Sequence, residues 1–462
     1  MEISLKPLEG NSTVLIQNAV DACFKCGGGK VILENGTYYI NSVRLRSNIT
    51  LYLKSGVVIR ASQVMDDYNI INDDKLEPLP EESRTDVLWT GPRTPNRNTD
   101  FLRKPGSRWT NAIFRIAHAK NVNIIGEDGC LIDGRNSYDP IGEEHYRGAH
   151  GISMYHSSDM VFEGLTLKDT GNWAFASYFA QNMVFRNLKI WGGHDGVHTS
   201  AADNVLVENC VMDTGDDAIA GFDINGMTVR NCVLNSSCSA FRVGGNDILI
   251  ENCTNTTPHV YGFRGKLSPE DKAASVSSAG LARRTLAFFT YYADFTLTVR
   301  NRPSNIVIRN CKTVGPRKLL HFNFSGAEVW QLNRPLADIS FENVEALEMD
   351  LPVCAYASAD DPITLKFKNC KLGFMANPPA PLDAVIYAAN YKHIDIDGLE
   401  VVGADAPLIS TWGGDGELTV KGLVGVGEIA AQADTEFTIR GLGGASAQLI
   451  RKAENEFTVK GI

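Results

Sequence analysis

Three aspartates near the middle of the chain have the residue type and the spacing for acid–base chemistry. Asp195 stands alone, and Asp216 and Asp217 form a pair 21 and 22 residues further on. That offset is nearly the period of a repeat in the flanking sequence. If each repeat is one coil of a solenoid, the three carboxyl groups lie together on one wall. Hydrolysis of a glycosidic bond needs such a group, because one carboxyl protonates the leaving oxygen while others activate water.

The repeat consists of short blocks in which apolar and polar residues alternate, followed by Asn and a small residue. Clear copies begin at residues 159, 182, 204, 226 and 247, then at 305 and 338, and weaker copies follow near 366, 393, 417, 436 and 456. A unit this short cannot bury a core alone and must stack on its neighbours. The alternation indicates strands, and the leucine spacing of leucine-rich repeats is missing. The sequence therefore predicts an all-β fold, a right-handed parallel β-helix.

An N-terminal helix is predicted to cap the first coil, because open strand edges invite aggregation. It covers residues 11–24, with Ser12 or Thr13 as N-cap and glycines at 27–29 as terminator. Its apolar stripe comprises Val14, Ile16, Ala19, Val20 and Cys23.

The rest of the chain is interpreted as one domain, 1–462, because no linker divides it. Residues 1–30 form the cap, and residues 380–462 are degenerate C-terminal coils. Residues 62–109 and 255–304 are insertions that leave the solenoid as loops and build the walls of a cleft.

Composition excludes several classes of function. The 462 residues have a hydrophobic fraction of 44% and a formal net charge of −10, as in a folded, soluble protein. This charge argues against nucleic-acid binding, which normally needs a basic face. No apolar run has the length of a membrane span, and the start lacks a secretory signal. We expect a cytoplasmic protein if Met1 is the native start, and a secreted or periplasmic protein if a signal has been removed.

The cysteines indicate an internal ladder rather than disulfides. Five of the ten occupy one repeated position: Cys210, Cys232, Cys253, Cys311 and Cys370. Cys23 and Cys26 have no second pair to complete a zinc site. No metal and no cofactor is expected.

Several segments resemble one family of β-helix enzymes. Residues 43–56 and 126–134 are similar to its early coils, and Trp173 lies where it carries a tryptophan before its catalytic coils. The family's Gly-Asp-Asp is intact at 215–217. On these segments the chain resembles glycoside hydrolase family 28, the polygalacturonase-like enzymes, over roughly residues 10–350.

The other motifs of the family are matched unevenly. Its Asn-Thr-Asp corresponds to residues 193–195, where only the aspartate is kept. Its Gly-His-Gly falls near residues 238–240, which contain no histidine. Its Arg-Ile-Lys corresponds to Arg264-Gly265-Lys266, which keeps both cations. The resemblance therefore implies an intact set of carboxylates and an altered sugar pocket.

The resemblance also assigns a role to each aspartate in an inverting cleavage. Asp216 is the general acid, and Asp195 with Asp217 positions and deprotonates the water. Three close carboxyl groups cannot all ionise cheaply, so one is held protonated. Inversion predicts about 6.5–9.5 Å between acid and base. One aspartate after glycine would be explained by capping of a turn, whereas three at this spacing favour catalysis.

Basic residues near the aspartates are candidates for binding the sugar. Arg264 and Lys266 are two residues apart, so on a strand they point to one face and could hold a uronate carboxylate. Arg242 lies between two apolar residues and so faces outward, where it could take the place of the missing histidine. A solvated surface pair is the alternative for Arg264 and Lys266.

Histidines and aromatic residues are further candidates. His194 and His198 either orient a carboxylate, bond a sugar hydroxyl or serve the structure. Trp173 either stacks on a sugar ring or fills the core, and core filling is favoured for Trp330. Residues 283–284 and 288–292 line the cleft or form an oligomer contact.

The expected function is that of an inverting glycoside hydrolase that acts on a pectin-derived or other acidic oligosaccharide or polysaccharide. Exo action is expected because the insertion at 62–109 could close one end of the cleft. Three alternatives stay open: a neutral or modified glycan as substrate, a β-helix lyase with a Ca²⁺ cluster, and a glycan-binding β-helix without catalysis. The expected partners are the saccharide and, through the inserted loops, a second copy of the chain. Neither nucleic acid nor a membrane is expected.

Overall fold

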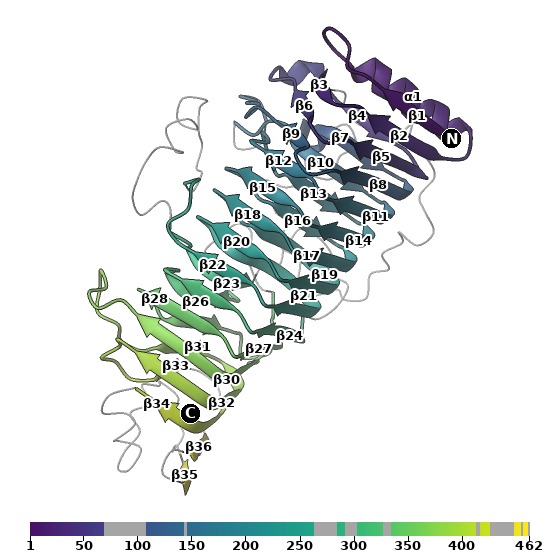
Figure 1. Ribbon diagram of the computed structural model, residues 1–462. Helices are drawn as coiled ribbons and strands as arrows, with labels where there is room; N and C mark the ends of the chain where they lie inside the picture. The colour runs from purple at the N-terminus through teal and green to yellow at the C-terminus, as the bar shows by residue number, and fades with distance from the viewer. Residues whose placement is uncertain are drawn as a thin grey trace.

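Figure 1 shows the computed structural model, an elongated solenoid with the N-terminus at one end and the last coils at the other. The structure describes residues 1–68, 108–142, 146–262, 284–291, 303–326, 334–412 and 416–425, and the backbone of 448–453 and 456–460. No helix in these ranges is both long and apolar enough to cross a membrane.

The solenoid has three faces, each a ladder of parallel strands from successive coils. Face 1 consists of β4 (Val43–Leu45), β7 (Ala112–Ala117), β10 (His150–Tyr155), β13 (Phe175–Tyr178), β16 (Val197–Ser200), the first parts of β19 (Ile219–Arg230) and β21 (Ser239–Glu251), β23 (Ala287–Tyr291), β26 (Lys318–Asn323), β29 (Val353–Tyr356), β31 (Ile386–Ala389) and β33 (Ile409–Trp412).

Face 2 contains the repeat blocks found in the sequence. It consists of β1 (Glu2–Leu5), β2 (Gly29–Leu33), β5 (Ile49–Leu53), β8 (Lys120–Gly126), β11 (Ser158–Glu163), β14 (Gln181–Arg186), β17 (Asp203–Glu208), the second parts of β19 and β21, β24 (Ile306–Arg309), β27 (Asp338–Glu342), the first parts of β30 (Ile363–Phe374) and β32 (Tyr391–Val402), and β34 (Glu417–Val424).

Face 3 closes each coil before the chain returns to face 1. It consists of β3 (Gly36–Ile40), β6 (Val57–Ala61), β9 (Leu131–Asp133), β12 (Thr166–Lys168), β15 (Lys189–Gly192), β18 (Val211–Thr214), β20 (Val233–Ser236), β22 (Thr254–Thr256), β25 (Lys312–Val314), β28 (Glu345–Met349) and the second parts of β30 and β32. Two short 3₁₀ helices, Met65–Asp67 and Arg108–Thr110, border the first insertion.

The core is a continuous apolar column inside the three faces. Alternate residues of each block point inward, so Val205 and Val207 on β17 lie in register with Met227 and Val229 on β19. The predicted cysteine ladder is buried and reduced at the end of face 2. The asparagine before each ladder cysteine adopts a left-handed turn conformation, and Asn252 donates to Asn231 across one coil.

The N-terminal cap is the helix α1 (Thr13–Lys25), which packs against β1, β2, β4 and β5. Four of the five predicted stripe residues are buried, but Val14 is exposed, so its place in the stripe was wrong. Ser12 is the N-cap residue, although its side chain makes no capping hydrogen bond. Asn11 accepts from the backbone N–H of Thr13 instead.

The last strands depart from the parallel pattern. β36 (Glu456–Lys460) runs antiparallel to both β34 and β35 (Gln448–Ala453). The weak repeat copy near residue 456 is therefore not a further parallel coil, and that interpretation was wrong. An antiparallel pair needs only a short turn between its strands, whereas a parallel pair needs a whole coil.

Candidate active site

The three aspartates lie on adjacent coils at the start of face 1 strands. Asp195 precedes β16, and Asp216 and Asp217 precede β19. The backbone N–H of Gly196 donates to the carbonyl of Asp217 at 2.9 Å, so Asp195 and Asp217 are neighbours across one strand spacing of about 4.8 Å. The solenoid period thus brings the predicted carboxylates together.

Gly215 permits this close stacking of turns. A Cβ at Gly215 would collide with the backbone of Gly193 in the preceding coil and with the carbonyl oxygen of Gly262. The backbone N–H of Gly215 donates to the carbonyl of Gly192 at 2.9 Å and holds the turn in place. The glycine before the aspartate pair is therefore a steric requirement of the turn.

Burial sets the protonation of two of the carboxyl groups. The side chains of Asp195 and Asp217 are 5% and 1% exposed, whereas that of Asp216 is 13% exposed. Burial, followed by the charge of Asp216, raises the pKa of Asp195 well above its usual range. Burial raises the pKa of Asp217 to about 7, although the charge of Arg242 opposes this. The raised pKa values fall on the two residues expected to activate water.

His198 holds Asp195 in a fixed orientation. Its Nδ1 lies 2.7 Å from Asp195 Oδ2, and its Nε2 lies 3.1 Å from Ser200 Oγ. Trp173 stacks face to face on the imidazole, with 3.7 Å between ring centroids and an interplanar angle of 4°. Trp109 contacts Trp173 edge to face. Of the roles considered for His198, the structure shows contact with a carboxylate, and one face of the Trp173 ring is covered by His198.

Arg147 lies beside the aspartate that is most exposed. Its Nη2 donates to Asp216 Oδ2 at 3.3 Å, and its Nη1 lies 3.0 Å from His194 Nδ1 and 3.2 Å from Asn172 Oδ1. The ring of Tyr146 stacks on His194 at a centroid distance of 5.9 Å. His194 is thus buried in contact with an arginine, and through it lies near Asp216.

A cysteine and a second arginine border Asp217. The Cys238 Sγ lies within 4.8 Å of a carboxylate oxygen of Asp217, and burial raises the pKa of its thiol. Arg242 Nη1 lies 3.5 Å from Asp217 Oδ2. Arg242 is on β21, in register with Ala220 on β19, and its side chain is 22% exposed. The backbone N–H of Ser239 also donates to Asp217 Oδ1 at 3.0 Å.

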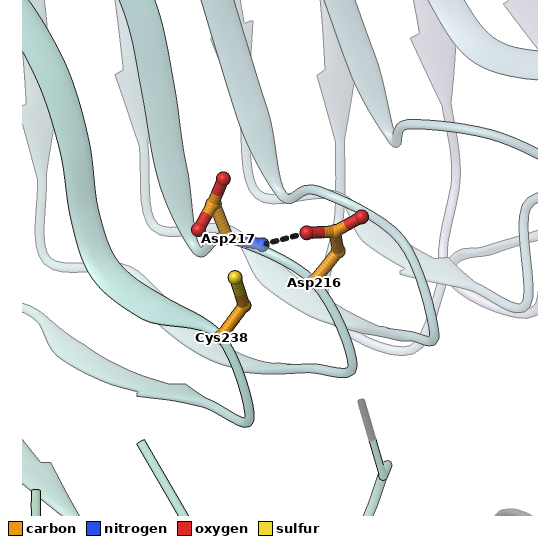
Figure 2. A group of neighbouring side chains, drawn as sticks. All are labelled: Asp216, Asp217 and Cys238. Carbon is orange, nitrogen blue, oxygen red and sulfur yellow. Dashed lines mark hydrogen bonds between the residues drawn. The ribbon is translucent and has the colours of Figure 1, made fainter. Parts of the chain in front are cut away.

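Asp216, Asp217 and Cys238 are also the group of possible metal ligands found within the described residues (Figure 2). Their ligand atoms lie within 4.8 Å of one another. Figure 2 shows the Asp216 carboxylate accepting from the backbone N–H of Asp217. Two guanidinium groups, of Arg147 and Arg242, already supply positive charge to these carboxylates, and a metal ion would have to compete with them.

Some predicted site residues cannot be placed. Arg264 and Lys266 lie outside the described residues, as do Trp330, Arg283 and Tyr292. Within the described part of the second segment, Arg284 pairs with Asp350 at 3.0 Å.

Sequence reasoning missed Arg147, Cys238 and Trp109 as site residues. Arg147 and Trp109 lie outside the repeat blocks, and their contacts with the site span many residues in the chain, 69 in the case of Arg147 and Asp216. Cys238 could have been found, because it adjoins Ser239, near which the family histidine is missing. A thiol is only a weak hydrogen-bond donor, and this chemistry offered no reason to select it.

Comparisons with known proteins bear on the fold. Residues 105–255 match a family model described as the right-handed β-helix region. A probable polygalacturonase of Vitis vinifera is 25% identical over 221 residues, which are 45% of this chain. The match spans only 40% of that relative's length.

Two solved structures share the architecture at low identity. The hyperthermoactive exopolygalacturonase of Thermotoga maritima aligns over 88% of this chain and 91% of its own, with 13% identity and a TM-score of 0.56. The family 28 exopolygalacturonase of Yersinia enterocolitica aligns over 88% and 78%, with 14% identity and a TM-score of 0.54. The predicted right-handed parallel β-helix, similar to that of polygalacturonases, is thereby confirmed.

Proposed function

We propose that this polygalacturonase-like β-helix is a glycoside hydrolase that cleaves an acidic oligosaccharide or polysaccharide with inversion. The observation that carries the proposal is the set of three carboxyl groups on two adjacent coils, two of them with a raised pKa and two of them paired with arginines. A pectin-derived substrate fits the resemblance to a polygalacturonase and the positive charge of Arg147 and Arg242.

The proposed reaction uses the carboxyl groups on opposite sides of the sugar. Asp216, the most exposed, donates a proton to the glycosidic oxygen as the bond from the anomeric carbon breaks. Asp217 takes a proton from a water whose oxygen forms the new bond to that carbon, and Asp195, whose raised pKa favours its protonated form, positions the water. A carboxylate with a pKa near 7 is a stronger base than an ordinary one, which suits this role. His198 keeps Asp195 aligned by its hydrogen bond.

The decisive experiment is a parallel screen of acidic and neutral oligosaccharides with the wild-type protein and Asp216→Asn. We expect acidic substrates to be cleaved by the wild type alone, with the inverted anomer as first product by NMR. Exo action predicts single units or short products from the first minutes. Cleavage that survives the substitution would refute the assignment of Asp216. Sensitivity to EDTA together with an ultraviolet-absorbing unsaturated product would indicate a lyase instead.

A further inference from the structure

A second basic cluster lies on face 1, beyond the candidate active site. The chain register places Ser239 beside Asp217, then Ala287 on β23, then Lys318 at the start of β26. Lys318 therefore lies three strand spacings, or about 14 Å, along the solenoid from Asp217. The next outward position on these strands runs from Arg242 through Thr290 to His321.

The charge of Lys318 is poorly compensated. Its Nζ lies 3.4 Å from His321 Nδ1 and 3.9 Å from Cys354 Sγ, which are neutral acceptors. Among the residues that the structure describes, no carboxylate lies within ion-pair distance of Lys318, although the side chain is half-buried. Its neighbour Arg317 pairs with Asp350. A partly buried ammonium without an anion is unfavourable unless a ligand supplies one.

His321 is kept neutral by the same surroundings. Burial, followed by the charges of Lys318 and Arg242, lowers its pKa to about 4. Since Nδ1 faces the Lys318 ammonium, the proton of the neutral ring is on Nε2, where it can be donated to a ligand. Two cations and one neutral N–H donor thus face the same strip of surface.

We propose that Lys318 and His321 form an anion subsite that binds the carboxylate of a second uronic acid unit, away from the cleaved bond. This inference rests on the proposed function and deepens it, because it requires a substrate with at least two acidic units. The ammonium of Lys318 supplies charge, and the His321 Nε2–H supplies a directed hydrogen bond. This subsite lies three strand spacings from Asp217 along the solenoid, on the side away from Arg147.

The test compares Lys318→Met with the wild type on oligogalacturonates of increasing length. For oligomers long enough to reach the subsite, we expect KM to rise about 10-fold or more with kcat changed less than about two-fold, because a charge-assisted contact is lost from the bound substrate. The shortest cleavable oligomer should show no change. Methyl-esterified oligomers should bind the wild type more weakly than the free acids do. Lys318→Met should not weaken the binding of these esters further. Lys318→Arg should restore most of the affinity.

Lys312→Met is the matched control, because Lys312 lies on face 3 at the end of the preceding coil and pairs with Glu345 at 3.0 Å. A KM unchanged at every length in Lys318→Met, while the wild type cleaves acidic oligomers, would overturn the subsite and leave the proposed function intact. If the wild type cleaves none of them, the subsite is tested by calorimetry instead. This experiment compares the binding of oligogalacturonates to Asp216→Asn with their binding to the double variant that also carries Lys318→Met. Equal binding by the two proteins, or no binding by either, would also overturn the subsite.

Discussion

Replacement of Asp217 by asparagine should stabilise the protein at neutral and alkaline pH. Asp217 is 1% exposed, and its pKa rises from 3.8 to about 7 because burial disfavours its charge. The folded state therefore binds a proton more tightly than the unfolded state. Stability contributed by this proton is fully present below about pH 4 and is lost as the pH rises through about 7. Asparagine resembles the protonated acid in size and removes the charge.

The size of the effect follows from the pKa. Each pH unit of difference is worth about 1.4 kcal/mol, so a rise from 3.8 to about 7 corresponds to about 4 kcal/mol at high pH. The oxygen of the new amide could keep the hydrogen bond that Ser239 N–H now donates to Asp217 Oδ1. The amide nitrogen would face Arg242 with a donor, which reduces the gain. We therefore expect a stabilisation of about 2–4 kcal/mol at about pH 8.

Thermal unfolding of wild type and Asp217→Asn across about pH 4 to 9 measures this directly. The melting temperature of the variant should exceed that of the wild type by several degrees at high pH, and the difference should shrink to near zero at about pH 4. Asp397→Asn is the control, since Asp397 is 53% exposed, 4.0 Å from Lys421, and should change little. A difference that is independent of pH, or a less stable variant at pH 8, would refute the reasoning.

Two other predictions concern the groups that border the aspartates. Arg147→Lys should lower kcat/KM by about 10- to 100-fold with a nearly unchanged melting temperature, because one ammonium cannot contact Asp216, His194 and Asn172 as the guanidinium does; full activity in steady-state assays would contradict this. The Cys238 thiol should resist iodoacetamide at about pH 8, because burial and the nearby carboxylates raise its pKa, whereas the exposed Cys26 should react. Peptide mass spectrometry would show equal labelling of the two if the environment of Cys238 were wrongly described.

The fold could be predicted because the same sequence pattern recurs in many successive coils. Each block alternates apolar and polar residues, and the asparagine and cysteine at its end mark the same turn in every coil, as at Asn252 and Cys253. The pattern weakens where the chain stops stacking in parallel. That is why the copy near residue 456 was misinterpreted: a short alternating strand fits an antiparallel pair equally well.

The site was predictable only where it follows the period. Asp195 and Asp217 lie 22 residues apart and are neighbours in space for that reason. Arg147 and Trp109 reach the site from segments without a repeat, so no spacing could place them. The burial of each carboxyl group could not be predicted from the sequence either, because it depends on packing from several coils. In the structure the raised pKa values are those of Asp195 and Asp217.

The register of face 1 limits how the spacing between functional groups on this surface can change. Asp217 and Lys318 are 101 residues apart in sequence, yet they are separated by only three steps of the ladder, because the insertions leave at turns without displacing the strands. Along the solenoid axis, the backbone positions that carry functional groups on this face can therefore be separated only by multiples of about 4.8 Å. Loops can be lengthened or replaced freely, while spacing changes only by gain or loss of a whole coil. A polymer of identical units is a natural match for a surface with a fixed increment.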